Sequence, residues 1–238
     1  MDKQYVIKTT GLTYHYSKDA KTLSEINLQV ERGSVYGFLG PNGSGKTTTL
    51  SLLLGLLNNQ QGDIEIFGQH LHANRIDILR KVGSLIETPS LYGHLTAKEN
   101  LEVYRAVYSA PKEKIAEVLK VVGLDTGKKV VKKFSLGMKQ RLSIALALLP
   151  SPELLVLDEP SNGLDPAGII ELREFFEVAD KIICRLVFFQ KKIEVVRGRS
   201  HFNTPRDQFL GPFNNPHQHF FSGHHRFMQV HLPVHQAA

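Results

Sequence analysis

The chain has 238 residues, of which 42% are hydrophobic, so it can bury one sizeable core or a core domain with a small subdomain. No apolar stretch approaches the ~20 residues that a membrane span needs, and the first residues lack a signal-peptide pattern. The single cysteine, Cys184, offers no disulfide framework. These features exclude a membrane-spanning protein and a disulfide-rich secreted scaffold, and they favour the cytoplasm.

The net charge of +6 comes mostly from the end of the chain. Residues 178–238 hold eight Lys and Arg against three Asp and Glu, a balance of +5, whereas the first 177 residues are nearly neutral. A groove for a nucleic-acid backbone should lie in the folded domain and carry positive charge. We therefore expect no nucleic-acid partner.

The first third of the chain predicts strands followed by a helix. Residues 4–16 and 26–30 alternate apolar and polar side chains or carry β-branched residues, which favours antiparallel strands. Residues 34–39 are typical of a buried strand that ends in a glycine-rich turn, and residues 47–57 favour a helix. Two shorter strands are expected after this helix, over residues 63–67 and 82–86.

Between about residues 90 and 150 the pattern becomes helical. Thr96 and Glu99 have the spacing of a capping box, and residues 112–122 and 136–149 repeat apolar side chains at i, i+3 and i+4. A buried strand at 154–157 and a helix over 166–177 follow. Strands that alternate with helices indicate a parallel sheet, here with a helical insertion.

Residues 40–47 match the phosphate-binding pattern G-x-x-x-x-G-K-[ST] between a predicted strand and a predicted helix. Glycines let backbone N–H groups approach a phosphate, and the helix start adds partial positive charge. We expect Lys46 to neutralise the β- and γ-phosphate oxygens of ATP and Thr47 to bind Mg²⁺. An ordinary glycine-rich turn with a surface lysine is the alternative. The predicted ATP-binding residues of this segment are Gly40, Asn42, Gly43, Ser44, Gly45, Lys46, Thr47 and Thr48.

The run Leu-Leu-Val-Leu-Asp-Glu at residues 154–159 delivers two carboxylates to the carboxyl edge of the predicted sheet. Asp158 is the candidate metal ligand, and Glu159 is placed to polarise the attacking water. Alone, this pattern also fits two solvated loop acids. Beside a phosphate-binding loop it predicts an α/β fold: a P-loop NTPase parallel sheet with an N-terminal antiparallel β subdomain and a helical insertion.

Two further segments resemble the ATP-binding cassettes of ABC transporters. Residues 134–141, Phe-Ser-Leu-Gly-Met-Lys-Gln-Arg, resemble the signature motif, and residues 158–166, Asp-Glu-Pro-Ser-Asn-Gly-Leu-Asp-Pro, resemble the catalytic strand and D-loop. The resemblance implies that Ser135 and Gly137 contact the γ-phosphate held by a second cassette, with a homodimer as the working unit. It also implies a separate transmembrane permease and a peripheral position on the inner face of the cell membrane.

Two other residues take expected roles from this resemblance. Tyr16 resembles the aromatic residue that stacks on adenine, and the alternative is a core or edge-strand tyrosine. Glu87 stands where the family has the glutamine of the Q-loop, so it is a candidate catalytic residue near Mg²⁺, or else a plain loop acid. The segment at 87–92 is similar to cassettes of lantibiotic self-protection and bacitracin-type exporters, which implies a peptide-like substrate.

The resemblance covers about residues 4–177, so we expect a cassette over 1–177, with its helical subdomain at about 90–150, and an atypical tail over 178–238 that is not a native domain. The tail holds seven of the eleven histidines and eight of the thirteen phenylalanines. The resemblance places a phosphate-contacting histidine at position 191, where this chain has lysine.

A frameshift would account for this tail, because codons for residues 184–191, read two bases later, permit but do not require Ser-Ser-x-Leu-Leu-Ser-Glu, close to the family pattern. We then expect no strand after Phe189 and little ATP hydrolysis. The alternative is that residues 182–189 form the missing strand and Lys191 contacts phosphate.

The sequence therefore predicts an ATPase subunit that couples ATP binding and hydrolysis to export through a membrane partner. Two alternatives stay open: a catalytically defective or truncated remnant, and a soluble ABC ATPase of translation or DNA repair.

Overall fold

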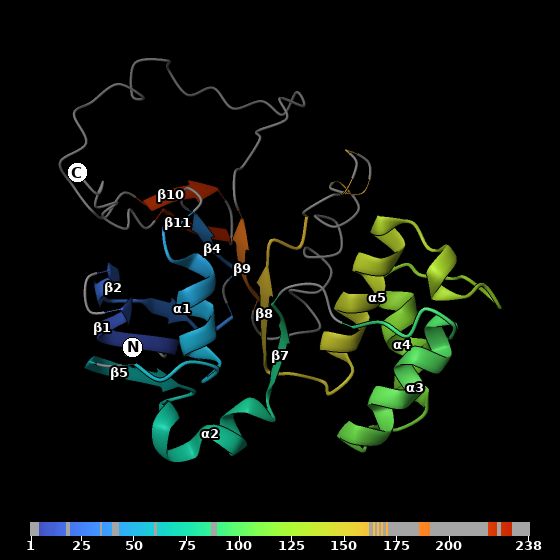
Figure 1. Cartoon of the computed structure of the whole chain (residues 1–238), viewed down its shortest axis with the longest axis horizontal. Helices are drawn as coiled ribbons and strands as arrows, with labels where there is room; N and C mark the ends of the chain where they lie inside the picture. The colour runs from blue at the N-terminus through green and yellow to red at the C-terminus, as the bar shows by residue number, and fades with distance from the viewer. Residues whose placement is uncertain are drawn as a thin grey trace.

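The computed structural model describes residues 5–17, 20–33, 35–39, 43–59, 61–86, 90–161, 164, 166, 168, 170, 186–190, 219–222 and 225–229. These residues form two sheets and a group of helices that packs beside the second sheet (Figure 1). In these ranges we find no helix with both the length and the apolar character that crossing a membrane requires.

The first sheet confirms the predicted antiparallel subdomain. Its strand order is β2-β1-β5-β6, with β3 pairing to β1, and the strands are β1 (Tyr5–Ser17), β2 (Ala20–Ile26), β3 (Gln29–Glu31), β5 (Gln61–Ile66) and β6 (Gln69–His70). The strands β2 and β6 were not predicted as separate elements. The pairing of β1 with β2 shifts register between Leu12 and Tyr14 and twice more before Ser17, so these residues keep no simple alternation.

The second sheet has the order β10-β11-β4-β9-β8-β7. Its strands are β4 (Val35–Leu39), β7 (Val82–Leu85), β8 (Leu154–Asp158), β9 (Leu186–Gln190), β10 (His219–Ser222) and β11 (His225–Gln229). The five strands from β11 to β7 run parallel, and only the β10–β11 hairpin is antiparallel. The predicted parallel sheet is thereby confirmed.

The expectation that no strand follows Phe189 is wrong. The strands β10 and β11 follow it, and β11 pairs with the edge of β4. The alternative, a strand over residues 182–189, is confirmed in part, because β9 spans Leu186–Gln190 and lies between β4 and β8. Strand pairing satisfies backbone N–H and C=O groups, so it can form without the alternating side-chain pattern that sequence inspection relies on. The frameshift and the identity of the tail as a non-native segment stay predictions, because most of residues 178–238 lies outside the described ranges.

Strand β8 separates the molecule into two hydrophobic cores. Leu154 and Val156 pack with the antiparallel sheet and α1 (Lys46–Leu53), whereas Leu155 and Leu157 pack with the helical insertion. Successive side chains of a strand point to opposite faces, so this alternation is the expected one. All four side chains are at most 1% exposed, which makes β8 the fixed centre of the fold.

The helical insertion contains α3 (Ala97–Tyr108), α4 (Glu113–Val121) and α5 (Leu136–Leu148), with a short 3₁₀ helix at Val131–Lys133 before α5. The capping box is confirmed: Thr96 Oγ1 accepts from Glu99 N, and Glu99 Oε2 accepts from Thr96 N at 2.7 Å. These hydrogen bonds lower the pKa of Glu99, with the bond to the Thr96 backbone as the largest cause.

Three other expectations differ from the structure or lie outside it. Helix α1 ends at Leu53 rather than Leu57, because Gly55 takes φ 62° and stops the helical bonding. Helix α2 (Leu71–Leu79) was not predicted, and its backbone is kinked at Asn74. The helix expected over residues 166–177 lies mostly outside the described residues.

Candidate nucleotide site

The start of α1 is the centre of the candidate site. Gly45, the residue before the helix, has φ 85°, a left-handed conformation that strains residues with a side chain. Within the described residues, no side chain caps this helix start, and its first turn holds no acidic residue. The N–H groups of the turn therefore suit an anion, which the positive end of the helix dipole also attracts.

Two buried side chains beside this turn fit the phosphates of ATP. The hydroxyl of Ser44 is buried and has no hydrogen-bond partner among the described residues. A buried hydroxyl without a partner costs free energy, which a phosphate oxygen would recover. Lys46 is also buried, at 7% exposed, and lysine is rarely buried unless an opposite charge lies near it.

Two of the three residues expected near Mg²⁺, Thr47 and Asp158, are in direct contact. Thr47 Oγ1 donates to Asp158 Oδ2 at 2.8 Å, so the first turn of α1 and the carboxyl end of β8 meet at one point. A hydroxyl and a carboxylate are the hard oxygen ligands that Mg²⁺ prefers, and the remaining positions suit phosphate oxygens and water. The residues present therefore fit a magnesium ion bound together with a nucleotide.

Tyr16 lies at the same helix. Its hydroxyl is 3.3 Å from Thr48 Oγ1, while 64% of the residue is exposed, and Tyr14 packs edge-on against its ring at a centroid distance of 5.0 Å. An exposed aromatic ring that is held from the side by a neighbour suits stacking of a base. This exposure excludes a core tyrosine but not an edge-strand tyrosine, so stacking on adenine stays a prediction.

Glu159 directly follows β8 and has φ 44°, which is uncommon for a residue other than glycine. Such a conformation costs of order 1–3 kcal/mol and persists only where the surrounding structure enforces it. It turns the chain sharply at the edge of the sheet that also carries Asp158. The strain fits a residue whose position serves chemistry rather than stability.

Ser135 and Gly137 lie at the start of α5, away from the start of α1 (Figure 1). Ser135 caps the helix by accepting from Met138 N at 3.3 Å. A Cβ at Gly137 would lie 3.4 Å from Leu164 Cδ2, so the segment after Glu159 packs against the first turn of α5. Leu136 is 53% exposed, and the serine is exposed as well.

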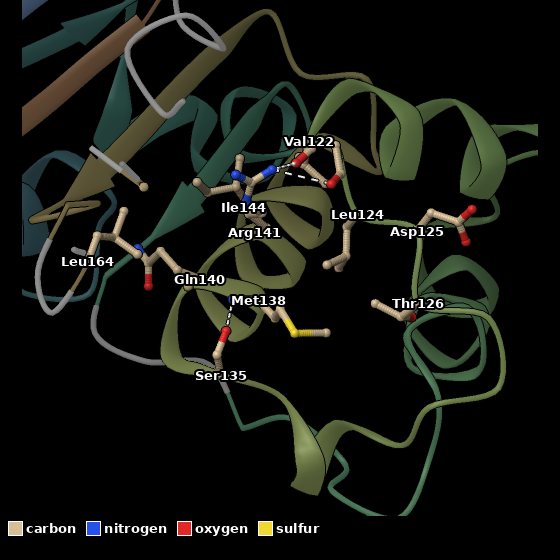
Figure 2. A pocket seen from close by; sticks show the side chains of 13 residues that line it. Val122, Leu124, Asp125, Thr126, Ser135, Met138, Gln140, Arg141, Ile144 and Leu164 are labelled. Carbon is tan, nitrogen blue, oxygen red and sulfur yellow. Dashed lines mark hydrogen bonds between the residues drawn. The ribbon is translucent and has the colours of Figure 1, made fainter. Parts of the chain in front are cut away.

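A cavity of about 420 Å³ lies beside this helix start. Figure 2 shows Leu124, Thr126 and Met138 pointing toward a common space. Arg141 lines the cavity and donates to the carbonyls of Val122 and Gly123 at 3.1 and 3.2 Å, which braces the end of α4 against α5. The cavity combines polar and apolar groups and opens beside Ser135.

The structure thus brings together Tyr16, the residues at 43–48 and Asp158, with Glu159 next to them in the chain. It does not bring Ser135 and Gly137 to this point. Gly40, Asn42 and Glu87 lie outside the described residues, so their predicted roles are not tested.

Apart from Gly137, the residues of α5 that line the cavity were given no individual site role from the sequence. Gln140, Arg141 and Ile144 follow Gly137 at intervals of three and four, which places them on one helix face. That spacing was visible in the sequence. The loop residues Asp125 and Thr126, in contrast, carried no periodic signal.

Comparisons with known proteins agree with this geometry. A family model described as ABC transporter matches residues 23–162. The chain is 54% identical over 170 residues to the bacitracin transport ATP-binding protein BcrA of Bacillus licheniformis, covering 71% of this chain and 55% of that protein. It is 45% identical over 173 residues to the lantibiotic transport ATP-binding protein SrtF of Streptococcus pyogenes, covering 72% of this chain and 74% of SrtF.

Among solved structures, CbiO1 of Clostridium perfringens, part of the ABC transporter complex CbiONQ, matches with a TM-score of 0.72. The identity is 27%, and the match covers 82% of this chain and 81% of CbiO1. This structural match agrees with the α/β fold described above.

The chain spans little more than half of some curated relatives, 55% of the Bacillus licheniformis BcrA and 57% of the BcrA of Enterococcus faecalis. The family match itself, residues 23–162, takes up more than half of this chain and includes the phosphate-binding loop, the residues at the start of α5 and the acidic end of β8. The chain belongs to the ABC transporter family and has the fold of its ATP-binding cassettes.

Proposed function

We propose that the chain is the ATP-binding subunit of an ABC exporter, and that it binds Mg-ATP and pairs head to tail with a second cassette. The observation that carries this proposal is the 2.8 Å contact between Thr47 and Asp158 at an uncapped helix start. In the bound state Lys46 and the N–H groups of α1 hold the phosphates, Tyr16 stacks on the base, and Glu159 orients the attacking water. Bound Mg²⁺ supplies charge neutralisation at the phosphate oxygens.

Pairing follows from the separation of the two halves of the site. Ser135 caps an exposed helix start that has no acidic residue in its first turn, which suits a phosphate. Because this helix start lies away from α1 in the same chain, the phosphate it binds is the one held by a second cassette. Twofold symmetry then builds two complete sites from two identical chains.

Light scattering in ATP and Mg²⁺ tests this pairing. The Glu159→Gln chain, in which hydrolysis does not dissolve the pair, should approach twice the monomer mass, because both nucleotides stay trapped between the subunits. The same chain with an added Lys46→Ala change should stay monomeric, because it loses the phosphate contact. A monomer in both cases would contradict the paired site.

The membrane partner and the substrate are proposed from the relatives. Names of similar proteins refer to bacitracin and lantibiotic transport. We propose that this chain likewise acts at the inner face of the cell membrane, with a separate permease that exports a peptide-like substrate. The segment at 87–92 is the sequence feature that links the chain to these exporters, and a place for Glu87 near the metal is part of this proposal.

A chimera tests the substrate class. Residues 1–177 of this chain replace the matching part of the Bacillus licheniformis BcrA, and the host's bacitracin resistance is measured. Resistance should be retained, because the same-family cassette supplies the ATP site, and it should fall when the chimera carries Lys46→Ala. A chimera that accumulates and binds ATP yet gives no resistance would exclude bacitracin-type export.

A further inference from the structure

Asn100 is fully buried in the first turns of α3, at 0% exposed. Its side-chain oxygen accepts from Tyr92 N at 2.8 Å, and its side-chain nitrogen donates to Tyr92 O at 3.1 Å and to Thr96 O at 2.9 Å. Both amide hydrogens and the amide oxygen are therefore used. All three bonds go to the backbone of one loop, residues 90–96, and none goes to another helix.

The loop 90–96 is also hydrogen-bonded to the segment 130–132, which precedes α5. Val131 N donates to Leu95 O at 2.9 Å, and Lys132 N donates to Gly93 O at 2.8 Å. Thr96 and Val130 form an isolated antiparallel bridge. The loop and the segment 130–132 are thus joined by backbone hydrogen bonds, so a shift of one displaces the other.

The segment leads without a break into the start of α5. Phe134 N donates to Val131 O at 3.0 Å, Phe134 is buried at 6% exposed, and the next residue is the helix cap Ser135. Two residues separate the hydrogen-bonded segment 130–132 from the helix cap Ser135. The direction of the helix start therefore depends on where the loop 90–96 holds residues 130–132.

Packing alone does not explain why the buried residue at position 100 is an asparagine. An apolar side chain would fill the space without desolvation cost, whereas a fully bonded amide fixes one conformation of the loop it binds. Helix packing in this region already has its own apolar core, which includes Leu101, Val118 and Leu142. Asn100 therefore fixes the position of the loop 90–96 and is not needed to fill the apolar core.

We propose that Asn100 is a positioning residue: through the loop 90–96 and the segment 130–134 it sets the place of Ser135 and Gly137, and so the strength of pairing between two cassettes. The link to pairing rests on the function proposed above. The placement of the segment does not, because it is a property of the single chain.

The test compares Asn100→Ala with the control Val118→Ala. Val118 is also buried, on α4, but its side chain forms no hydrogen bond to the loop. Urea unfolding shows how far each variant is destabilised. Amide hydrogen exchange is then read at Val131 and Lys132. Exchange at these two amides should rise about tenfold or more beyond the control in Asn100→Ala, since their acceptors lie on the released loop.

Pairing and nucleotide affinity are measured in the Glu159→Gln background. Asn100→Ala should pair at least about tenfold more weakly than Val118→Ala, while its Mg-ATP affinity, measured by calorimetry, stays within about twofold. If pairing were weakened equally in both variants, Asn100 would contribute only to stability, and the proposal would be overturned. Unchanged exchange at Val131 and Lys132 would overturn it as well.

Two provisions keep the outcome decisive. If Asn100→Ala does not fold, Asn100→Asp preserves the size and the acceptor for Tyr92 N but loses both donors, and the same rise in exchange is expected. If the Glu159→Gln chain itself fails to pair, the proposed function fails, and the exchange comparison alone decides whether Asn100 holds the segment.

Discussion

Thr47 and Asp158 are 111 positions apart in the chain, yet their side chains share one hydrogen bond. The hydroxyl that donates to the carboxylate keeps both oxygens close to the position where a metal ion would sit. Binding Mg²⁺ then requires a small rearrangement of two side chains rather than the assembly of a site. Preorganisation of this kind lowers the free-energy cost of binding.

We predict that Thr47→Val removes most of the gain in ATP affinity that Mg²⁺ provides, a loss of about 2 kcal/mol, because valine keeps the shape and lacks the oxygen ligand. Affinity for ATP in excess chelator should stay nearly the same. Thr47→Ser retains the hydroxyl and should retain the Mg²⁺ effect. Calorimetry with and without Mg²⁺ measures all three chains, and an unchanged Mg²⁺ effect in Thr47→Val would exclude the proposed metal ligand.

At this scale the sequence predicted the phosphate loop and the acidic pair, because each is a short motif whose spacing reflects a chemical requirement. It did not predict the contact of Tyr16 with Thr48, nor the three hydrogen bonds of Asn100. Some of these residues were given roles from the sequence, but no motif predicts that they contact each other. Their partners are backbone groups or side chains brought close by the tertiary fold.

Among the elements, α3 is the helix whose start was best predicted. Thr96 and Glu99 form both bonds of the capping box, and the carboxylate bound to the Thr96 N–H has a lowered pKa. A group whose pKa is lowered by folding stabilises the fold above its unfolded pKa. That stabilisation is lost as the pH falls through the folded pKa.

We predict that Glu99→Ala lowers the urea midpoint at pH 7, and that the difference from the wild type shrinks as the pH falls below the usual range of a glutamate. Unfolding curves of both chains at a series of pH values measure this. Glu117→Ala is the control, since Glu117 is also exposed on a helix and bonds only to Lys114. A Glu99 difference that stays constant with pH would contradict the capping role.

The hairpin of β10 and β11 is, like α2, a part of the fold that the sequence failed to predict. Its residues include His219, His225 and Arg226, and they show no sustained alternation. Strand β11 pairs in parallel with the edge of β4, from Arg226 to Gln229, and this pairing fixes its position. An edge strand can recruit a partner through backbone groups alone, and such pairing leaves little trace in side-chain pattern.

In the whole molecule, β8 connects the two functional halves. One face of this strand packs on the core beneath α1, and the other packs on the helices that carry Ser135. Because interiors are close-packed, a displacement at the carboxyl end of β8 is transmitted to both cores. The core beneath α1 and the core of the helical insertion are therefore mechanically joined through β8.

The last prediction concerns hydrolysis by the chain as it stands. The parallel strand β9 ends at Gln190, which is paired with Leu39 at the edge where the phosphate loop begins, and the next residue is Lys191, where the resemblance places a histidine. Losing one group that contacts the γ-phosphate in the transition state commonly lowers the rate ~10²–10³-fold. We therefore expect phosphate release at least about a hundredfold slower than in a chain whose reading frame is shifted from codon 184 onward.

The two proteins are purified side by side, with Lys46→Ala of the shifted chain as the blank, and phosphate release is measured at saturating Mg-ATP. Equal turnover would reject the frameshift and make the tail a functional extension. Activity in the shifted chain alone would establish that the tail after residue 184 replaces a functional one.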